Sequence, residues 1–372
     1  MQVQPAAFLR TSLPLGIDKL QEFDSGRYHS IWLPDHMVSF WPDSIWTPEF
    51  TDLATLSPSP HRHLDAMAVA GASAALTKNT PIATCVVDTV RRHPSLLAQT
   101  AVTLSHLSQG RFILGLGSGE LENTVPYGFD FSKPVSRLEE SIEVIKLLWH
   151  SDGPVNFNGK FYQLEHARLD TELYEGKAPP IWIGAAGPRM LGITGKHADG
   201  WWPAGAFTPE DYAAKLRVIH ESAEKADRDP ANITTALTQI ALIGDDQEIK
   251  EMLEAPLVKS IILMLTASDL KQFGYEHPMG ANWRGIQDFN PTILTRERIL
   301  QFCADMNPQA ILDIFPCGTP EHVATKLKGF AEAGMQVYKI MNYSGMAGLK
   351  FSANSEARVR ETEDALARQL EV

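Results

Sequence analysis

The apolar positions of the chain follow two alternating patterns, short continuous runs and longer segments with helical spacing. Continuous apolar runs of this length are typical of parallel strands that are covered on both faces. The strand pattern occurs in segments 3–9, 28–34, 80–86, 112–116, 180–185, 199–203, 234–243 and 337–342. A helical pattern follows each of them, at 16–27, 64–77, 94–108, 134–149, 188–196, 209–227, a segment that starts at 319–321, and 354–370.

This alternation predicts an α/β fold, a (β/α)8 TIM barrel with insertions. A doubly wound parallel sheet is the alternative that the pattern leaves open. We expect residues 1–372 to form a single barrel domain, with insertions at about 37–63 and 245–315, where the alternation breaks. The segment 155–169 predicts a hairpin, because Asn158-Gly159 is a strong turn signal.

Composition excludes several functional classes. The formal net charge is −12 and no basic cluster is present, which argues against binding to nucleic acid or to an anionic membrane surface. The three cysteines have neither disulfide-like nor metal-like spacing, so we expect no metal site. No apolar run approaches the ~20 residues that span a bilayer, and the start lacks the features of a signal peptide. We therefore expect a cytoplasmic protein without a membrane span.

The most informative stretch is 111–123, a predicted buried strand that runs into a glycine-rich turn. Gly117 and Gly119 allow the backbone to approach a ligand closely or to adopt positive φ. Glu120 and Asn123 follow where a loop at the carboxyl end of a barrel strand opens onto an active site. The motif is neither a P-loop nor a regular dinucleotide fingerprint, and a tight strand-to-helix connection is its simplest interpretation.

Further candidates lie where the other predicted strands end. Residues just past parallel strands converge on one face of a barrel. They are Asp35 and His36 after the second strand, Cys85 and Val86 after the third, and Ala185, Ala186 and Gly187 after the fifth. Gly187-Pro188 places a helix start there, which suits a phosphate group. The set predicts a site for a planar cofactor that carries a phosphate, with His36 as a candidate acid–base group.

Four motifs in the chain resemble the bacterial luciferase-like superfamily, in its branch that uses coenzyme F420. They are Trp32-x-Pro-Asp-His36, Arg91-x-x-Pro94, Gly-Arg-Phe-x-Leu-Gly-x-Gly-x-Gly-Glu120 and Ile-x-Ile-Gly-Ala-Ala-Gly-Pro188. The segments 125–128, 187–191 and 276–280 are most similar to the mycobacterial phthiodiolone ketoreductases. The resemblance implies a (β/α)8 barrel, commonly a homodimer, that transfers hydride between a deazaflavin and a carbonyl or alcohol carbon.

The resemblance also implies roles for individual residues. Asp35 and Asn123 would contact the cofactor, and Cys85-Val86 would form a cis peptide bond behind its ring. Residues 185–187 would hold its phosphate-bearing tail. His36 and Glu120 match the polar residues that lie beside the reacting carbon and the ring, so both would be catalytic.

The predicted substrate is an apolar or lipid-like ketone, or its secondary alcohol. Sugar-phosphate dehydrogenases of this branch have a lysine near the stretch 202–207, where this chain has no basic residue. We expect no basic side chain to be placed for a phosphate. We expect apolar side chains at the mouth of the site: Phe40, Trp41, Trp46, Met279 and Trp283. An FMN-dependent monooxygenase and a non-catalytic flavin carrier are the alternatives.

Overall fold

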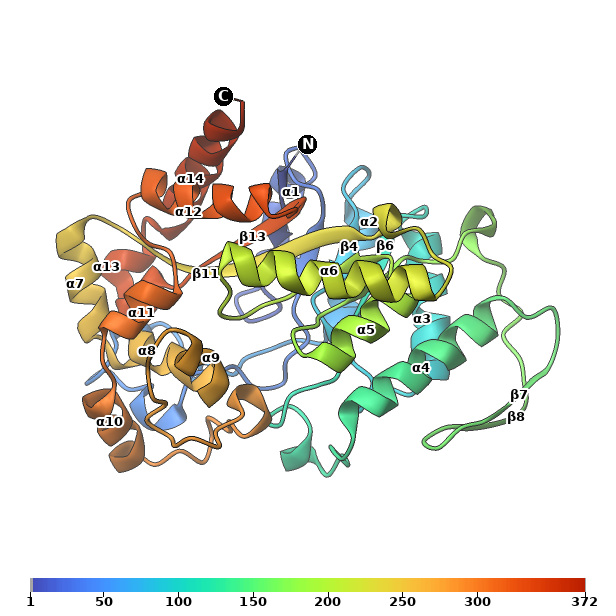
Figure 1. The fold of residues 1–372 in the computed structure, drawn as a ribbon, viewed down its shortest axis with the longest axis horizontal. Coiled ribbons are helices and arrows are strands. Elements are labelled where there is room, and N and C mark those ends of the chain that lie inside the picture. Colours follow the sequence, from blue (N-terminus) through green and yellow to red (C-terminus); the bar gives the residue numbers. More distant parts are fainter. Residues whose placement is uncertain (1–2, 372) are drawn as a thin grey trace.

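The computed structural model describes residues 3–371, which form a barrel of parallel strands surrounded by helices (Figure 1). Neighbouring strands follow the order β1-β13-β11-β10-β9-β6-β4-β3-β2. Their bounds are Gln4–Pro5 (β1), Ala7–Phe8 (β2), Ile31–Leu33 (β3), Ile82–Thr84 (β4), Phe112–Gly117 (β6), Ile181–Ile183 (β9), Gly200–Trp201 (β10), Thr234–Ile243 (β11) and Val337–Asn342 (β13). Two short strands pair in parallel beside this path, β5 (Val87–Asp88) with β6 and β12 (Cys317–Gly318) with β11. The predicted TIM-like barrel is confirmed, and the doubly wound sheet is excluded.

The first strand segment closes the barrel by changing partners. β1 pairs with Val337 and Tyr338 of β13, whereas β2 pairs with Ile31 and Trp32 of β3. Ala6, between them, donates its backbone N–H to Tyr338 (2.7 Å). After this bond the chain moves toward β3, so the wall of the barrel opens between β2 and the rest of β13.

Most predicted helices agree with the observed ones to within a few residues. The helices around the barrel are α2 (Ala66–Leu76), α3 (Pro94–Leu107), α4 (Pro134–Trp149), α5 (Pro188–His197), α6 (Pro209–Lys225), α12 (Pro320–Glu332) and α14 (Ser355–Leu370). The first helix is shorter than predicted, a 3-10 turn at Ile17–Lys19 followed by α1 (Leu20–Phe23). It ends at Asp24, whose carboxylate accepts backbone N–H groups from residues 78–80, and Gly26 then adopts a positive φ of 84° that does not continue a helix.

Tryptophans fill the interior of the barrel. The rings of Trp32 and Trp202 lie 3.6 Å apart between centroids, and Trp182 lies 5.1 Å from Trp32. The Trp202 indole donates to the Thr238 hydroxyl (2.5 Å), so its polar N–H is satisfied in the core. Ala6, Ala83, Ile113, Ala236 and Val337 complete this layer. Because the lumen is packed, ligands must bind above it, at the carboxyl ends of the strands.

The segment 245–315 builds a second hydrophobic cluster beside the barrel. It contains α7 (Asp246–Glu254), α8 (Pro256–Lys259), α9 (Ala267–Gln272), α10 (Arg296–Asp305), α11 (Gln309–Ile314) and two 3-10 turns. Phe289 and Phe302 are fully buried there, together with Ile45 from the loop 37–63. The two irregular segments therefore pack on each other, at the end of the molecule opposite to the hairpin (Figure 1).

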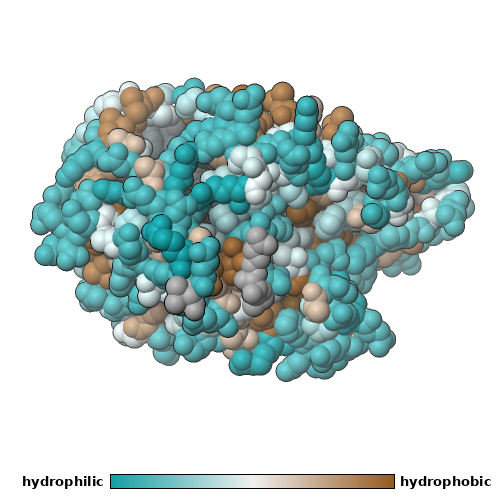
Figure 2. All heavy atoms as spheres, turned by 90° about the horizontal axis from the view of Figure 1, so that it is seen from above, coloured by the Kyte–Doolittle hydropathy of each residue, from teal (hydrophilic) through white to brown (hydrophobic). Residues whose placement is uncertain are grey.

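The predicted hairpin is present as β7 (Val155–Asn158) and β8 (Gln163–Ala167), and it projects from the body of the molecule (Figure 1). The face in Figure 2 is largely hydrophilic, with apolar residues in scattered patches. Among residues 3–371, no helix has both the length and the apolar character needed to cross a bilayer.

Candidate active site

Four neighbouring strands carry the predicted site residues at their carboxyl ends. The sheet order β3-β4-β6-β9 places four segments along one part of the barrel rim: 35–36, 85–86, 117–123 and 185–187. Loops at the carboxyl ends of barrel strands form the active sites of TIM-barrel enzymes. The tertiary structure thus brings together segments that are up to about 150 residues apart in the chain.

His36, Glu120 and Asn123 are in direct contact. The distance from Nδ1 of His36 to Oε2 of Glu120 is 3.2 Å, and the Asn123 amide nitrogen donates to the same oxygen (2.9 Å). Only 18% of the His36 side chain and 25% of the Glu120 side chain are exposed. Nε2 of His36 has no hydrogen-bonding partner within the described part of the chain, so it is available to a ligand.

The orientation of the Asn123 amide is determined by the backbone. Its Oδ1 accepts the N–H groups of Met37 (2.7 Å) and Val38 (2.9 Å). Its NH2 group must therefore face His36, Glu120 and the neighbouring Glu122. Asn123 joins the loop after β3 to the loop after β6 and keeps the catalytic candidates in register.

The ion pair changes the protonation of both partners. Burial of the imidazole opposes its charge, but the Glu120 carboxylate outweighs this effect and raises the pKa of His36. Burial acts to raise the pKa of Glu120 as well, yet His36 and the Asn123 amide lower it. An imidazolium beside a carboxylate is therefore the favoured state near neutral pH.

Glu122 is a member of this cluster that the sequence analysis missed. Its side chain is fully buried, its Oε1 accepts a hydrogen bond from Asn123 (3.3 Å), and its Oε2 has no partner. Burial and the negative charge of Glu120 raise the pKa of Glu122 to about 10, so it is a neutral acid at pH 7. The available signal was a second carboxylate, two residues after Glu120, in a loop without a basic residue.

The side chains of His36, Glu120 and Glu122 have the donor atoms of a metal site, within 4.8 Å of one another. The Asn123 NH2 group, however, lies against all three of them. Because Oδ1 of Asn123 is bound to the backbone, this amide cannot turn to offer its oxygen to a cation. The arrangement is suited to holding protons rather than a metal ion.

The Asp35 carboxylate faces two guanidinium groups. It pairs with Arg91 (2.8 Å) and Arg92 (3.1 Å), and only 5% of the residue is exposed. Arg91 also binds Asp88 and the backbone carbonyl of Asp35. In this structure Asp35 therefore anchors the loop that carries His36, and a contact with the cofactor remains a prediction.

The wall behind the predicted ring site is made of closely packed backbone. The peptide bond Cys85–Val86 is cis, as the resemblance implies. A Cβ atom at Gly117 would lie 2.5 Å from Cγ2 of Val86, and one at Gly115 would overlap the carbonyl oxygen of Thr84. Burial raises the pKa of the Cys85 thiol to about 12, so the wall is uncharged there. A closely packed, neutral wall of this kind suits a planar ring.

The start of α5 is open and has no side-chain cap. Gly187 is its N-cap, Pro188 is its first residue, and a Cβ atom at Gly187 would meet nothing within 4 Å. The first N–H groups of a helix have no partner inside the helix, so the start of α5 suits a phosphate. Ala186 is exposed beside it, whereas Ala185 is buried and its carbonyl accepts the Trp201 indole N–H (2.8 Å).

A cavity of about 270 Å³ lies next to this rim and includes His36 in its wall. Phe40 and Trp41 line it, as predicted, but Trp46 and Trp283 do not. Their indoles donate to the backbone carbonyls of Ser57 (2.9 Å) and Leu263 (2.9 Å), because the two irregular segments need them to build the second cluster. Met279 also packs on that cluster.

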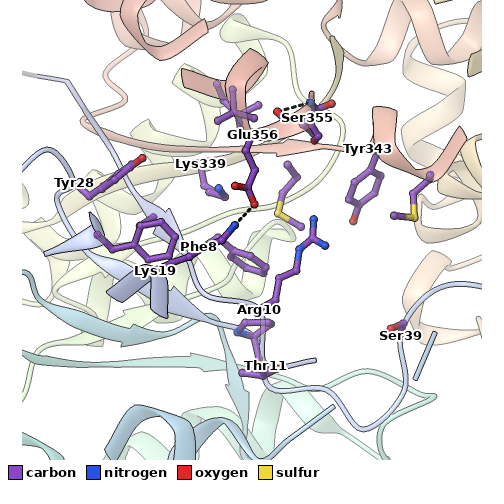
Figure 3. Close-up of a pocket in the computed structure, with 18 of the residues that line it drawn as sticks. Phe8, Arg10, Thr11, Lys19, Tyr28, Ser39, Lys339, Tyr343, Ser355 and Glu356 are labelled. Carbon is purple, nitrogen blue, oxygen red and sulfur yellow. Dashed lines mark hydrogen bonds and ion pairs between the residues drawn. The ribbon is translucent and has the colours of Figure 1, made fainter. Parts of the chain in front are cut away.

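We expected no basic side chain in a position to hold a phosphate, but two basic side chains without an ion pair among residues 3–371 lie in the wall of this cavity. Arg10, after β2, and Lys339, in β13, line the same cavity as His36 (Figure 3). Sequence reasoning missed them because they lie at opposite ends of the chain and meet only when the barrel closes.

Comparison with known proteins identifies the class. Residues 22–336 match the Luciferase-like monooxygenase family. The chain belongs to this family, which confirms the resemblance seen in the sequence. Its fold and family define it as an oxidoreductase of the luciferase-like type.

Two individual relatives and one solved structure show which members of the family are similar to this chain. The phthiodiolone/phenolphthiodiolone dimycocerosates ketoreductase of Mycobacterium kansasii is 34% identical over 319 residues, which are 85% of this chain and 87% of that protein. An F420-dependent glucose-6-phosphate dehydrogenase of Amycolatopsis mediterranei is 33% identical over 207 residues, 54% of this chain and 56% of that protein. The structure of an F420-dependent secondary alcohol dehydrogenase in complex with an F420-acetone adduct has a TM-score of 0.74 at 21% identity, and covers 98% of this chain and 99% of that chain. The last comparison concerns the fold alone.

Proposed function

We propose that this protein is a coenzyme F420-dependent oxidoreductase that transfers a hydride between the deazaflavin and a ketone or secondary alcohol. The observation that carries the proposal is the state of His36. Its Nδ1 is paired with Glu120, and its ring lines the cavity with Nε2 free. A histidine held in this way is arranged to exchange one proton at one defined atom. The ketoreductase relative and the F420-dependent dehydrogenase of Amycolatopsis mediterranei support the choice of reaction.

The residues at the rim would hold the cofactor in two parts. The ring would lie against Cys85–Val86 and the glycines 117 and 119, next to Glu120 and Asn123. The phosphate-bearing tail would lie at residues 185–187, where α5 begins. When bound, the deazaflavin supplies or accepts the hydride.

The chain itself handles the proton. With Glu120 ionised, Nδ1–H of His36 donates to Glu120, which leaves Nε2 to give a proton to a ketone oxygen or to take one from an alcohol. The raised pKa of His36 keeps Nε2 protonated near neutral pH, which favours ketone reduction. Glu120, ionised beside His36, would hold the imidazole ring in the orientation that this proton exchange needs. Packed walls orient the two reacting carbons and exclude water.

The lining of the cavity supports a substrate with an apolar body. Phe40 and Trp41 lie near His36, and Phe8, Met341 and Met346 line the cavity further on. Burial of apolar surface stabilises a complex by about 25 cal/mol per Å². A lipid-like ketone or its secondary alcohol fits this surface.

The test begins with cofactor choice. Titration with coenzyme F420 should quench tryptophan fluorescence at lower concentrations than titration with FMN. Anaerobic mixing of the reduced deazaflavin with a panel of methyl ketones should then restore the absorbance of the oxidised deazaflavin, and mixing of the oxidised deazaflavin with the matching secondary alcohols should bleach it. Tighter binding of FMN, together with oxygen uptake, would overturn the proposal and identify a monooxygenase.

A further inference from the structure

The opening in the barrel wall gives the cavity a second, charged part. Residues 339–343 of β13 and the turn after it have no strand neighbour on the side of β2, and they line the cavity together with Phe8 and Arg10. Figure 3 shows Arg10 extending into this space toward Tyr343, with Lys339 on the side of Glu356. One continuous cavity therefore runs from His36 to these two basic side chains.

Most charges of the cavity are already neutralised. Each of the three carboxylates in the cavity wall forms an ion pair. Glu356 pairs with Lys19 and Glu22 with Arg360, which are both in the wall, and Glu363 pairs with Arg27 outside it. Arg10 and Lys339 have no ion pair and no side-chain hydrogen bond with any residue from 3 to 371. These two side chains therefore carry positive charges that no direct ion pair within the described chain neutralises, although Glu363 and Glu356 lie close enough to interact with Lys339.

The charged form of Lys339 is destabilised by burial in this position. It lies on the same side of β13 as Val337, which faces the barrel interior, and its ammonium group is 5.6 Å from the Phe8 ring centroid. Burial lowers the pKa of Lys339 to about 8, although Glu363 acts in the opposite direction. Glu363 is buried and already accepts two hydrogen bonds from Arg27 (2.9 and 3.1 Å). Glu363 offsets only part of this desolvation cost, because the pKa of Lys339 remains lowered, and a bound anion would offset more of it.

The proposed cofactor does not require these cations. Its phosphate would lie at the start of α5, which follows β9, and β10 and β11 separate β9 from β13 around the barrel. The cations thus belong to the part of the cavity beyond His36, where the substrate would extend.

We propose that Arg10 and Lys339 form an anion subsite, and that the substrate is an apolar ketone or secondary alcohol that ends in a carboxylate. The reacting carbon would lie at His36, the apolar chain along Trp41, Met341 and Met346, and the carboxylate between Arg10 and Lys339. The assignment of the reacting end rests on the proposed function, whereas the anion subsite can be tested without it.

The first experiment measures binding alone. Decanoate, decanol and methyl decanoate are titrated calorimetrically into the protein without cofactor. Decanoate should bind tightest, and Arg10→Gln and Lys339→Met should each weaken it roughly 10- to 100-fold, the usual worth of a charge-assisted hydrogen bond. The two neutral compounds should be unaffected. Arg360→Met is the matched control, because Glu22 already neutralises that guanidinium group.

The second experiment measures turnover with methyl-ketone acids of increasing chain length and with their methyl esters. The acid should have the lower KM, and the two variants should raise its KM toward that of the ester with little change in kcat. The advantage of the acid should disappear above about pH 8 as Lys339 loses its proton, and Lys339→Arg should extend it to higher pH. The charged or titratable groups that act on Lys339 are the same in every variant of this position: Glu363, Glu356, Arg10 and Cys85. A difference in pH dependence between these variants therefore comes from residue 339 itself.

Equal binding of decanoate and methyl decanoate, or unchanged binding in both variants, would overturn the anion subsite. A clear preference for glucose 6-phosphate over the ketone acids would overturn the apolar carboxylate as substrate. Normal decanoate binding combined with no turnover of any ketone would refute the proposed function and leave the subsite standing.

Discussion

Replacement of Glu122 by glutamine should make the protein progressively more stable than the wild type as the pH rises. Glu122 is fully buried, and its pKa is raised from 4.5 to about 10. Between these values the folded protein keeps a proton that the unfolded chain releases, so the stability of the wild type falls with increasing pH. At pH 7 this cost is (7 − 4.5) × 1.36, on the order of 3 kcal/mol. Glutamine has no proton to release, so the stability of the variant does not carry this pH-dependent cost.

The pH dependence of the stability difference is a sharper test than the size of that difference at one pH. In the variant an NH2 group takes the place of Oε2, which has no partner, and its unsatisfied N–H groups cost about 1–3 kcal/mol at every pH. The stability difference between Glu122→Gln and the wild type should still grow by about 1.4 kcal/mol per pH unit. From pH 5.5 to 8.5 the total change should be about 4 kcal/mol.

Urea denaturation at several pH values measures this difference, with the fluorescence of the eight tryptophans as the signal. Equal m-values in both proteins would show that their unfolding is comparable. Glu172→Gln serves as the control, because this exposed side chain has no ion pair within residues 3–371 and should give a flat difference. A flat difference for Glu122→Gln as well would show that Glu122 is ionised in the folded protein, and would refute this account of the cluster.

Three further predictions concern the site and its support. His36→Asn should lower kcat roughly 100-fold or more, with little change in cofactor affinity; His63→Asn should cost far less, because burial and the charge of His36 lower the pKa of His63 to about 4 and its Nε2 is bound to Ser39. A His36→Asn enzyme with normal turnover would remove this residue from the mechanism. Glu120→Gln should slow turnover and lower the pKa of His36, so the pH profile of ketone reduction should lose its activity at lower pH than in the wild type; an unshifted profile would contradict the ion pair. Gly115→Ala should destabilise the fold by about 1–3 kcal/mol or more in thermal unfolding, because its Cβ would overlap Thr84; Gly153→Ala, which meets nothing within 4 Å, should be neutral, and equal effects of the two would refute the packing argument.

The sequence by itself determined the barrel and predicted the rim on which its candidate site lies. Alternation of apolar runs and helical spacing is a local property, so it predicts each strand and helix without knowledge of their contacts. The candidate site residues could be predicted as well, because they directly follow the predicted strands and parallel strands bring their carboxyl ends to one rim. They include the glycines 117 and 119. The hairpin at Asn158-Gly159 likewise depends on only a few neighbouring residues.

Only the tertiary structure decided which charges are buried and which are paired. In the sequence, nothing distinguishes Glu122 from a solvated loop carboxylate. In the structure, burial and the charge of Glu120 raise its pKa. Asp35 turned toward Arg91 and Arg92, and Trp283 joined the core of the insertion instead of the cavity. Arg10 and Lys339 meet because the first strand closes the barrel against the last one. Desolvation and charge pairing depend on such contacts between distant segments, and local sequence patterns carry no record of them.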